Sequence, residues 1–141
     1  MESSSTARVL VVAHKTAATP ALLDAVRARR AQGPASFTLL VPASSHGLER
    51  MLGADNPDTA DADAVLALAL PLLEEPAGGP VHGIASSAGP LEAIQDAVNV
   101  HGFDEIILST LPAHVSRWLH LDLPHKLNGL ELPLTTLTAK G

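Results

Sequence analysis

A chain of 141 residues with 46% hydrophobic side chains is long enough for one buried core, and with 2% aromatic residues that core has to be aliphatic. Such a composition suits parallel strands that are buried on both faces. The formal charge of −6 and the lack of a basic run exclude extended nucleic-acid binding, and the absence of cysteine excludes disulfides and cysteine-ligated zinc.

The first residues, Met1 to Thr6, are polar and lack the basic start and apolar stretch of a signal peptide. We expect a disordered tail over residues 1–7 and a single α/β domain over residues 8–141. No apolar run approaches the ~20 residues that a membrane-spanning helix needs. The protein is therefore expected to be cytoplasmic, with neither a membrane nor a nucleic acid as partner.

The first apolar run, residues 8–13, is rich in β-branched side chains and predicts a buried strand. A helix should follow, because Thr19 is a good N-cap residue and Pro20 suits the first helical position. Gly33-Pro34 ends that helix. Residues 36–42 then predict a second strand.

A second helix is expected to carry apolar side chains from Val65 to Leu73, with Asn56 or Asp58 as its N-cap. Pro71 lies inside this pattern. Because proline has no N–H to donate, it should kink the last turn or end the helix early.

The third predicted strand, residues 81–85, is the weakest because Gly83 interrupts it. A third helix opens at Gly89-Pro90 and ends at His101-Gly102, where glycine is a good stop. Residues 104–110 then predict the clearest buried strand of the chain.

Residues 133–138 predict a fifth strand. Strand and helical patterns thus alternate through the whole chain. Because parallel strands are joined by right-handed crossovers through helices, this order predicts an α/β fold with a doubly wound sheet.

Three segments in the last third of the chain carry a resemblance to a known family. Residues 104–110 resemble the fourth strand of universal stress proteins, Ser116-Arg117-Trp118-Leu119 resembles their Leu-Ser-Arg-Leu-Leu segment, and residues 132–137 resemble their C-terminal ending. The resemblance implies an adenine nucleotide α-hydrolase-like fold of three layers. In that fold a five-stranded parallel sheet has the order 3-2-1-4-5 and helices cover both faces.

Nucleotide-binding members of that family carry Gly-x2-Gly-x9-Gly and then Ser or Thr after the fourth strand, where glycines let backbone N–H groups approach phosphates. Counted from Ser109, the equivalent positions hold Ser109, Pro112, Asp122 and Leu123; aligned on Ser116-Arg117, the last pair becomes Leu121 and Asp122. Neither register contains a glycine, and Asp122 would repel phosphates. His14 also stands where the family often has an acidic residue. ATP binding is therefore expected to be lost.

A candidate ligand site remains at the carboxyl ends of the strands, where open α/β sheets hold ligands. The loops after the first and fourth strands should both open there. Their polar and cationic side chains are His14, Lys15, Thr16, Ser109, Thr110, His114, Ser116 and Arg117. A small anion or a nucleotide is the natural ligand for such a set.

Metal and hydrolase sites are less favoured. His114, His120 and His125 are spaced by six and five residues, whereas zinc-binding pairs on a helix lie at i and i+4. Ser109, His114 and Asp122 have the residue types of a hydrolase triad, but the chain has no Gly-x-Ser-x-Gly elbow. We expect no metal, no cofactor and no catalytic residue.

Two functional classes therefore remain. The leading hypothesis is a non-catalytic module like the universal stress proteins, with the role in stress response that the resemblance implies, acting through homodimerisation or a partner. The homodimer is expected through the C-terminal strand, whose Leu134 to Thr138 carry no charge. The alternative is a nucleotide- or anion-binding protein that uses Lys15, His114 and Arg117. Trp118 could belong to the core or to a partner surface.

Overall fold

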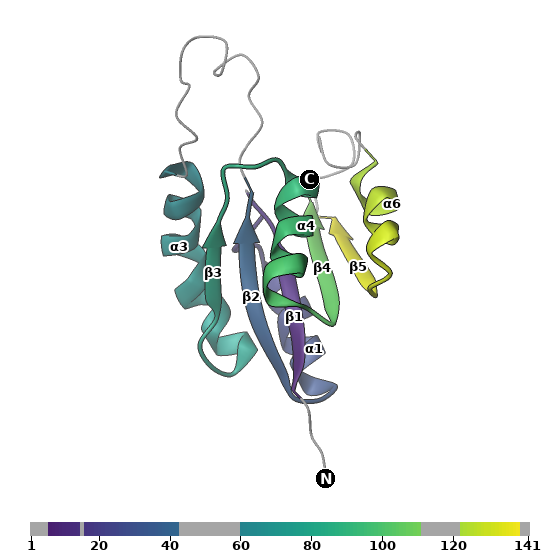
Figure 1. Cartoon of the computed structure of the whole chain (residues 1–141). Helices are drawn as coiled ribbons and strands as arrows, with labels where there is room; N and C mark the ends of the chain where they lie inside the picture. The colour runs from purple at the N-terminus through teal and green to yellow at the C-terminus, as the bar shows by residue number, and fades with distance from the viewer. Residues whose placement is uncertain (1–5, 15, 43–59, 111–121, 139–141) are drawn as a thin grey trace.

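The computed structural model of the chain describes residues 6–14, 16–42, 60–110 and 122–138 (Figure 1). Five parallel strands form one sheet in the order β3-β2-β1-β4-β5. They are β1 (Ala7–Val12), β2 (Ala35–Val41), β3 (His82–Ala85), β4 (Glu105–Thr110) and β5 (Leu134–Thr138). This confirms the predicted strand order, and each strand lies within one residue of its predicted ends.

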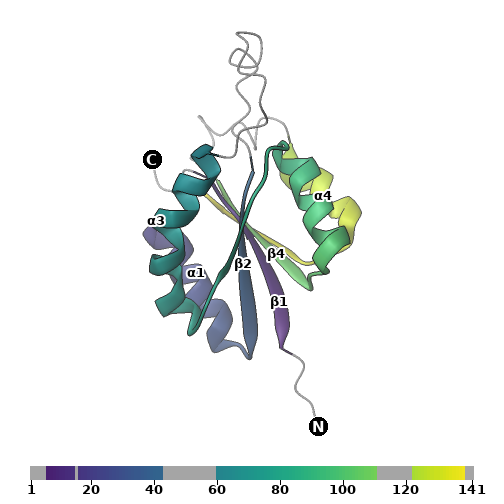
Figure 2. The same ribbon diagram turned by 60° about the vertical axis from the view of Figure 1, so that its left-hand side comes forward.

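Helices cover both faces of the sheet, as predicted (Figure 2). They are α1 (Pro20–Ala31), α3 (Ala60–Ala77), α4 (Pro90–His101) and the short α6 (Leu123–Leu127), which continues into a 3-10 turn, η1 (Asn128–Leu130). α1 and α3 lie on one face, and α4 and α6 lie on the other. Among the described residues, no helix has both the length and the apolarity that crossing a membrane would require.

The core has two aliphatic layers because side chains alternate along each strand. In β1, Val9 and Val11 point into the layer with α1 and α3, whereas Leu10 and Val12 point into the layer with α4 and α6. All four side chains are fully buried. The β-branched run at the start of the chain is therefore the central strand, buried on both faces as its composition predicts.

Gly83 lies inside the edge strand β3, opposite Leu39 of β2, and allows α3 to lie against the strand. A Cβ atom at this position would lie 2.9 Å from Leu70 Cδ1 and 3.0 Å from Leu66 Cδ2. The glycine predicted to interrupt the strand thus makes room for the two leucines, which pack on the sheet.

α3 continues through Pro71 to Ala77, so the prediction that the helix could end early at this proline is wrong. Pro71 is exposed, while Leu73 beyond it is buried in the core. The free energy gained by burying Leu73 offsets the cost of the one backbone hydrogen bond that Pro71 cannot make. The helix ends at Ala77. The next residue, Gly78, has a φ of +77°, and its N–H donates to the carbonyl of Glu74 at 2.9 Å. The predicted N-caps Asn56 and Asp58 lie outside the described residues.

Charged side chains tie the helices to the amino-terminal edge of the sheet. The Arg8 N–H donates to Asp104 Oδ2 at 2.7 Å, and the Arg8 guanidinium donates to the His101 carbonyl and lies over the Phe103 ring at 5.5 Å. Arg29 on α1 donates to Glu105 at the start of β4 at 2.7 Å. That hydrogen bond raises the pKa of the Arg29 guanidinium above its ordinary value.

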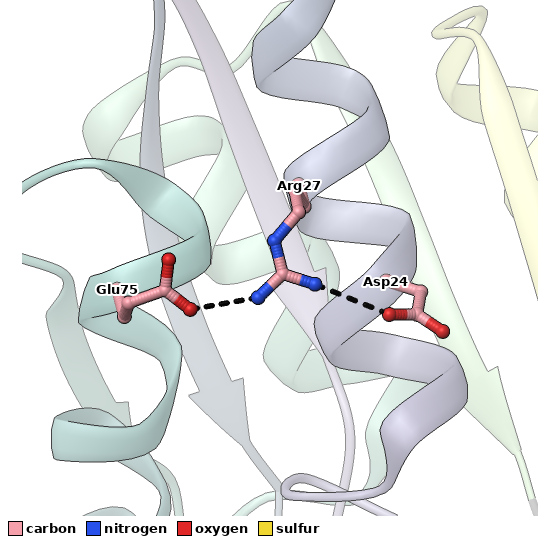
Figure 3. Close-up of polar contacts among 3 residues, drawn as sticks. All are labelled: Asp24, Arg27 and Glu75. Carbon is pink, nitrogen blue, oxygen red and sulfur yellow. Dashed lines mark hydrogen bonds and ion pairs between the residues drawn. The ribbon is translucent and has the colours of Figure 1, made fainter.

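A second, more exposed ion pair joins the two helices on one face. Arg27 on α1 lies between Asp24, at 3.2 Å, and Glu75 on α3, at 2.7 Å (Figure 3). The side chains are mostly exposed, so solvent weakens this pair more than the Arg29–Glu105 pair.

Candidate functional site

The strand order places a topological switch point between β1 and β4. From β1 the chain builds outward through β2 to β3 on one side, and from β4 it builds outward to β5 on the other. Ligands of open α/β sheets bind outside the carboxyl ends of the strands at such a point. Here those ends are Ala13-His14 after β1 and Ser109-Thr110 in β4.

Two hydroxyl groups meet across this point. The Thr16 hydroxyl donates to the Ser109 carbonyl at 3.1 Å and lies 2.7 Å from Ser109 Oγ. The Ser109 hydroxyl can then donate to Thr16 Oγ1, so that both protons are used. The two residues are only 2% and 3% exposed. The predicted meeting of the two loops is present, but these hydroxyls bond to each other inside the protein instead of facing a ligand.

Thr110 and His14 are also directed into the molecule. The Thr110 hydroxyl donates to the Leu137 carbonyl at 3.1 Å, which ties β4 to β5. Both ring nitrogens of His14 are buried. Of the predicted site residues that the structure describes, none presents its polar atoms on an open surface.

The loop between His14 and α1 is closed by its own hydrogen bonds. The Thr19 hydroxyl donates to the Thr16 carbonyl at 3.0 Å, and the Ala17 N–H donates to the His14 carbonyl at 3.3 Å. Thr19 is the N-cap residue by position, with Pro20 next as predicted, but its side chain makes no hydrogen bond to the helix N–H groups. The hydroxyl stabilises the loop instead of the helix end.

The cationic part of the predicted site lies outside the described residues. Lys15, His114, Ser116 and Arg117 fall there, as do Pro112 and Trp118. Ligand binding by these residues therefore stays a prediction. Within the described ranges, no group of three His, Asp or Glu side chains is arranged to hold a metal ion.

Asp122 marks the point where the chain re-enters the described fold. Its backbone is left-handed, with φ 58° and ψ 39°, and it is the N-cap residue of α6. Glycine adopts left-handed backbone more readily than any other residue. Both sequence registers place Asp122 opposite the phosphate-binding glycine or the residue after it. The position thus has a backbone that suits glycine together with an exposed acidic side chain.

Sequence reasoning did not foresee that Thr16 and Ser109 would bond to each other. The available signal was the position of two small hydroxyl residues at the carboxyl ends of neighbouring parallel strands, Ser109 near the end of β4 and Thr16 in the loop after β1. That spacing predicts proximity, which the structure confirms. It does not tell whether the hydroxyls face each other or a ligand, because that depends on the direction in which the loop turns.

Comparison with known proteins gives a likeness in fold. No family model and no curated protein sequence matches this chain. The solved structure of the universal stress protein from Archaeoglobus fulgidus is similar, with a TM-score of 0.58 and 13% identity over 95% of this chain and 93% of that one. The structure of the universal stress protein from the same organism in complex with dAMP has a TM-score of 0.57 and 13% identity over 96% and 98%. The chain therefore has the fold of the universal stress proteins.

Proposed function

We propose that this protein is a non-catalytic module that acts by association, in the first place with a second copy of itself through β5. The observation that carries the proposal is the open edge of the sheet. β5 is the last strand in the order, and no described residue pairs with its outer side. An uncharged open edge is a ready template for another strand.

The outward backbone groups of β5 can be assigned from one hydrogen bond. The Ile106 N–H donates to the Pro133 carbonyl at 2.9 Å, so Pro133 faces β4. Because backbone groups alternate in direction along a strand, Thr135 and Leu137 also face β4. Leu134, Thr136 and Thr138 therefore direct their N–H and C=O groups away from the sheet.

A twofold axis perpendicular to the strand would make β5 and its copy antiparallel and join the two sheets into one. Each copy would then satisfy the outward groups of the other, since such an interface uses the same surface twice. Thr135 and Thr136 are exposed in the single chain, so both faces of the new strand pair offer β-branched side chains for cross-strand contacts.

Two features support the loss of ATP binding in this proposal. The Thr16 and Ser109 hydroxyls are buried and bonded to each other, and Asp122 would repel a phosphate. One like charge at 4 Å costs on the order of 1 kcal/mol in water and about 4 kcal/mol near a protein surface.

The test uses proline on the open side of the strand. Thr136→Pro removes an N–H that faces away from β4, so the single chain should fold normally while pairing with a second copy is blocked. Sedimentation velocity should find a dimer for the wild type and for the matched control Thr136→Val, and a monomer for Thr136→Pro. A wild type that stays monomeric at high micromolar concentration, or a Thr136→Pro variant that pairs as tightly, would refute the proposal.

A second candidate function is nucleotide binding by Lys15, His114 and Arg117. The structure with dAMP among the similar proteins favours it, since that ligand is held by the same fold. Calorimetry with ATP or dAMP and magnesium separates the two. Association alone predicts no affinity tighter than about millimolar, or −4 kcal/mol. Micromolar affinity that Arg117→Ala abolishes would establish the second candidate instead.

A further inference from the structure

The outer surface of α3 carries apolar side chains that no other part of the described chain covers. Leu68 is 69% exposed and Leu72 is 47% exposed. Ala64, Ala67 and Pro71 are exposed beside them. These five residues, at i, i+3, i+4, i+7 and i+8, form one face of the helix, the α3 stripe. The opposite face of α3 buries Ala62, Ala69 and Leu73 in the core, so the helix is anchored to the sheet by side chains outside the stripe.

Acidic side chains border the α3 stripe. At about 100° per residue, Asp63 and Glu74 fall along the same side of the helix, and Glu75 lies in line with the stripe at its C-terminal end. All three are exposed. Glu75 bonds to Arg27 (Figure 3), whereas Glu74 has no ion pair with any described residue. Since Glu74 lies in the last turn of α3, at the negative end of the helix dipole, a cation beside it would be favourable.

The acidic border of the α3 stripe indicates which kind of partner can bind there. Two copies of the α3 stripe placed face to face in a parallel pairing would bring the two Glu74 carboxylates together. In any pairing, two chains that each carry a net charge of −6 would be brought together. A surface of anionic lipid is repelled for the same reason. A basic helix has the complementary charge.

We propose that the α3 stripe docks an amphipathic helix of a partner protein, whose apolar face covers Leu68 and Leu72 and whose Lys or Arg side chains pair with Glu74. Helix-on-helix recognition of this kind uses apolar anchors at i, i+3, i+4 and i+7. The stripe spans about 12 Å along the helix. Such a contact is at the small end of specific interfaces, below about 1,200 Å², and its affinity should be weak and reversible.

The α3 stripe is independent of the proposed dimer. α3 packs on β2 and β3, at the edge of the sheet opposite β5. Pairing through β5 would therefore leave both α3 stripes of a dimer accessible. Failure of one proposal leaves the other intact.

The experiment is a selection from a display library of 16-residue helical peptides against the full chain, with counter-selection against Leu68→Gln. The expected peptides combine an apolar face at i, i+4, i+7 and i+11 with Lys or Arg along its border. Selected peptides should bind the wild type with micromolar affinity in fluorescence anisotropy. Enrichment of acidic or neutral peptides, or failure to enrich any peptide that Leu68→Gln rejects, would overturn the proposal.

Matched variants on another helix make the test specific. Leu68→Gln and Glu74→Lys should each weaken binding of a selected peptide at least tenfold. The same changes on α4, Val100→Gln and Glu92→Lys, should alter it less than twofold, since Val100 and Glu92 are also exposed. Equal losses at both helices would mean non-specific attraction and would refute docking at α3. A Leu68→Gln change that converts a larger assembly of the wild type into its β5 dimer would show instead that a second copy occupies the stripe.

Discussion

The two ends of the sheet are held together by different chemistry. At the amino-terminal edge, Arg29 on α1 pairs with Glu105 at the start of β4. The Arg8 backbone N–H donates to the Asp104 carboxylate and the Arg8 guanidinium donates to the His101 carbonyl at the end of α4. At the carboxyl-terminal edge, the described ties are hydroxyl groups, chiefly the Thr16–Ser109 pair. The charged edge stabilises the fold, while the described residues that meet at the switch point, Thr16 and Ser109, are joined by neutral hydroxyl groups. For an anionic ligand at this edge, the sequence offers Lys15, His114 and Arg117 as the expected counter-charges.

Breaking the charged edge should have the largest effect on stability. Arg29→Met leaves the Glu105 carboxylate without its cation, with the two side chains only 18% and 22% exposed. We expect the free energy of unfolding to fall by about 2 to 3 kcal/mol, measured by urea denaturation. The double variant Arg29→Met/Glu105→Met should recover much of the loss. A single variant within about 0.5 kcal/mol of the wild type would contradict this role.

The contribution of the Arg29–Glu105 pair to stability should depend on pH in one direction only. The folded pKa of Arg29 is raised, so its contribution to stability is complete below the unfolded pKa and is lost only as the pH rises through the folded value, far above neutrality. The difference between wild type and Arg29→Met should therefore be constant from about pH 6 to pH 9. A difference that shrinks across that range would mean that another group controls the pair.

Breaking the Thr16–Ser109 hydroxyl pair should lower the free energy of unfolding by less than Arg29→Met does. Thr16→Val removes the hydroxyl that serves Ser109, and we expect a loss of about 1 to 2 kcal/mol because the buried serine keeps an unmet hydrogen-bonding group. Adding Ser109→Ala should restore part of it. Thermal or urea unfolding of the four proteins in this double-mutant cycle should give a coupling above about 0.5 kcal/mol. Strict additivity would show that the two hydroxyls do not stabilise one another.

Substitutions of Asp122, the residue with left-handed backbone at the start of α6, should change the free energy of unfolding by a smaller amount. The direction should depend on the new residue. Asp122→Ala should lower stability by about 1 kcal/mol, because alanine tolerates a φ of 58° poorly. Asp122→Gly should match or slightly exceed the wild type. Glu131, which has the same φ, provides the parallel pair of variants. Equal stability of the alanine and glycine variants in urea titrations would argue against a left-handed backbone here.

The smallest effect is expected for the exposed pair on the helices. Arg27→Ala should change the free energy of unfolding by about 0.5 kcal/mol or less, since water competes for Asp24 and Glu75. The change should shrink further in 1 M salt. A loss of stability as large as that of Arg29→Met would show that exposure does not weaken the Arg27 ion pairs.

The sheet could be predicted from the sequence because each strand is a short apolar run and each described crossover has a helical pattern. Pro20 and Pro90 also mark their helix starts correctly. The early helix end expected at Pro71 was wrong because the cost of a proline inside the helix is outweighed by the burial of Leu73. That burial is a tertiary effect, which a local sequence pattern does not contain.

The candidate site could be predicted only in part. Strand ends place Thr16 and Ser109 at one edge, and the structure confirms that they meet. Their burial and mutual bond could not be foreseen, because loop direction depends on contacts such as the one from Thr19 to Thr16. The cationic residues of the predicted site lie outside the described residues, so their part in it stays a prediction.

The central claim, association through β5, is tested most directly by hydrogen exchange of individual amides at several protein concentrations. Thr135 and Leu137 face β4, so their amides should be protected at every concentration. The outward amides of Leu134 and Thr136 should exchange quickly in dilute protein and become protected as the concentration rises into the dimeric range. Outward amides that exchange equally fast at all concentrations would contradict pairing through this strand.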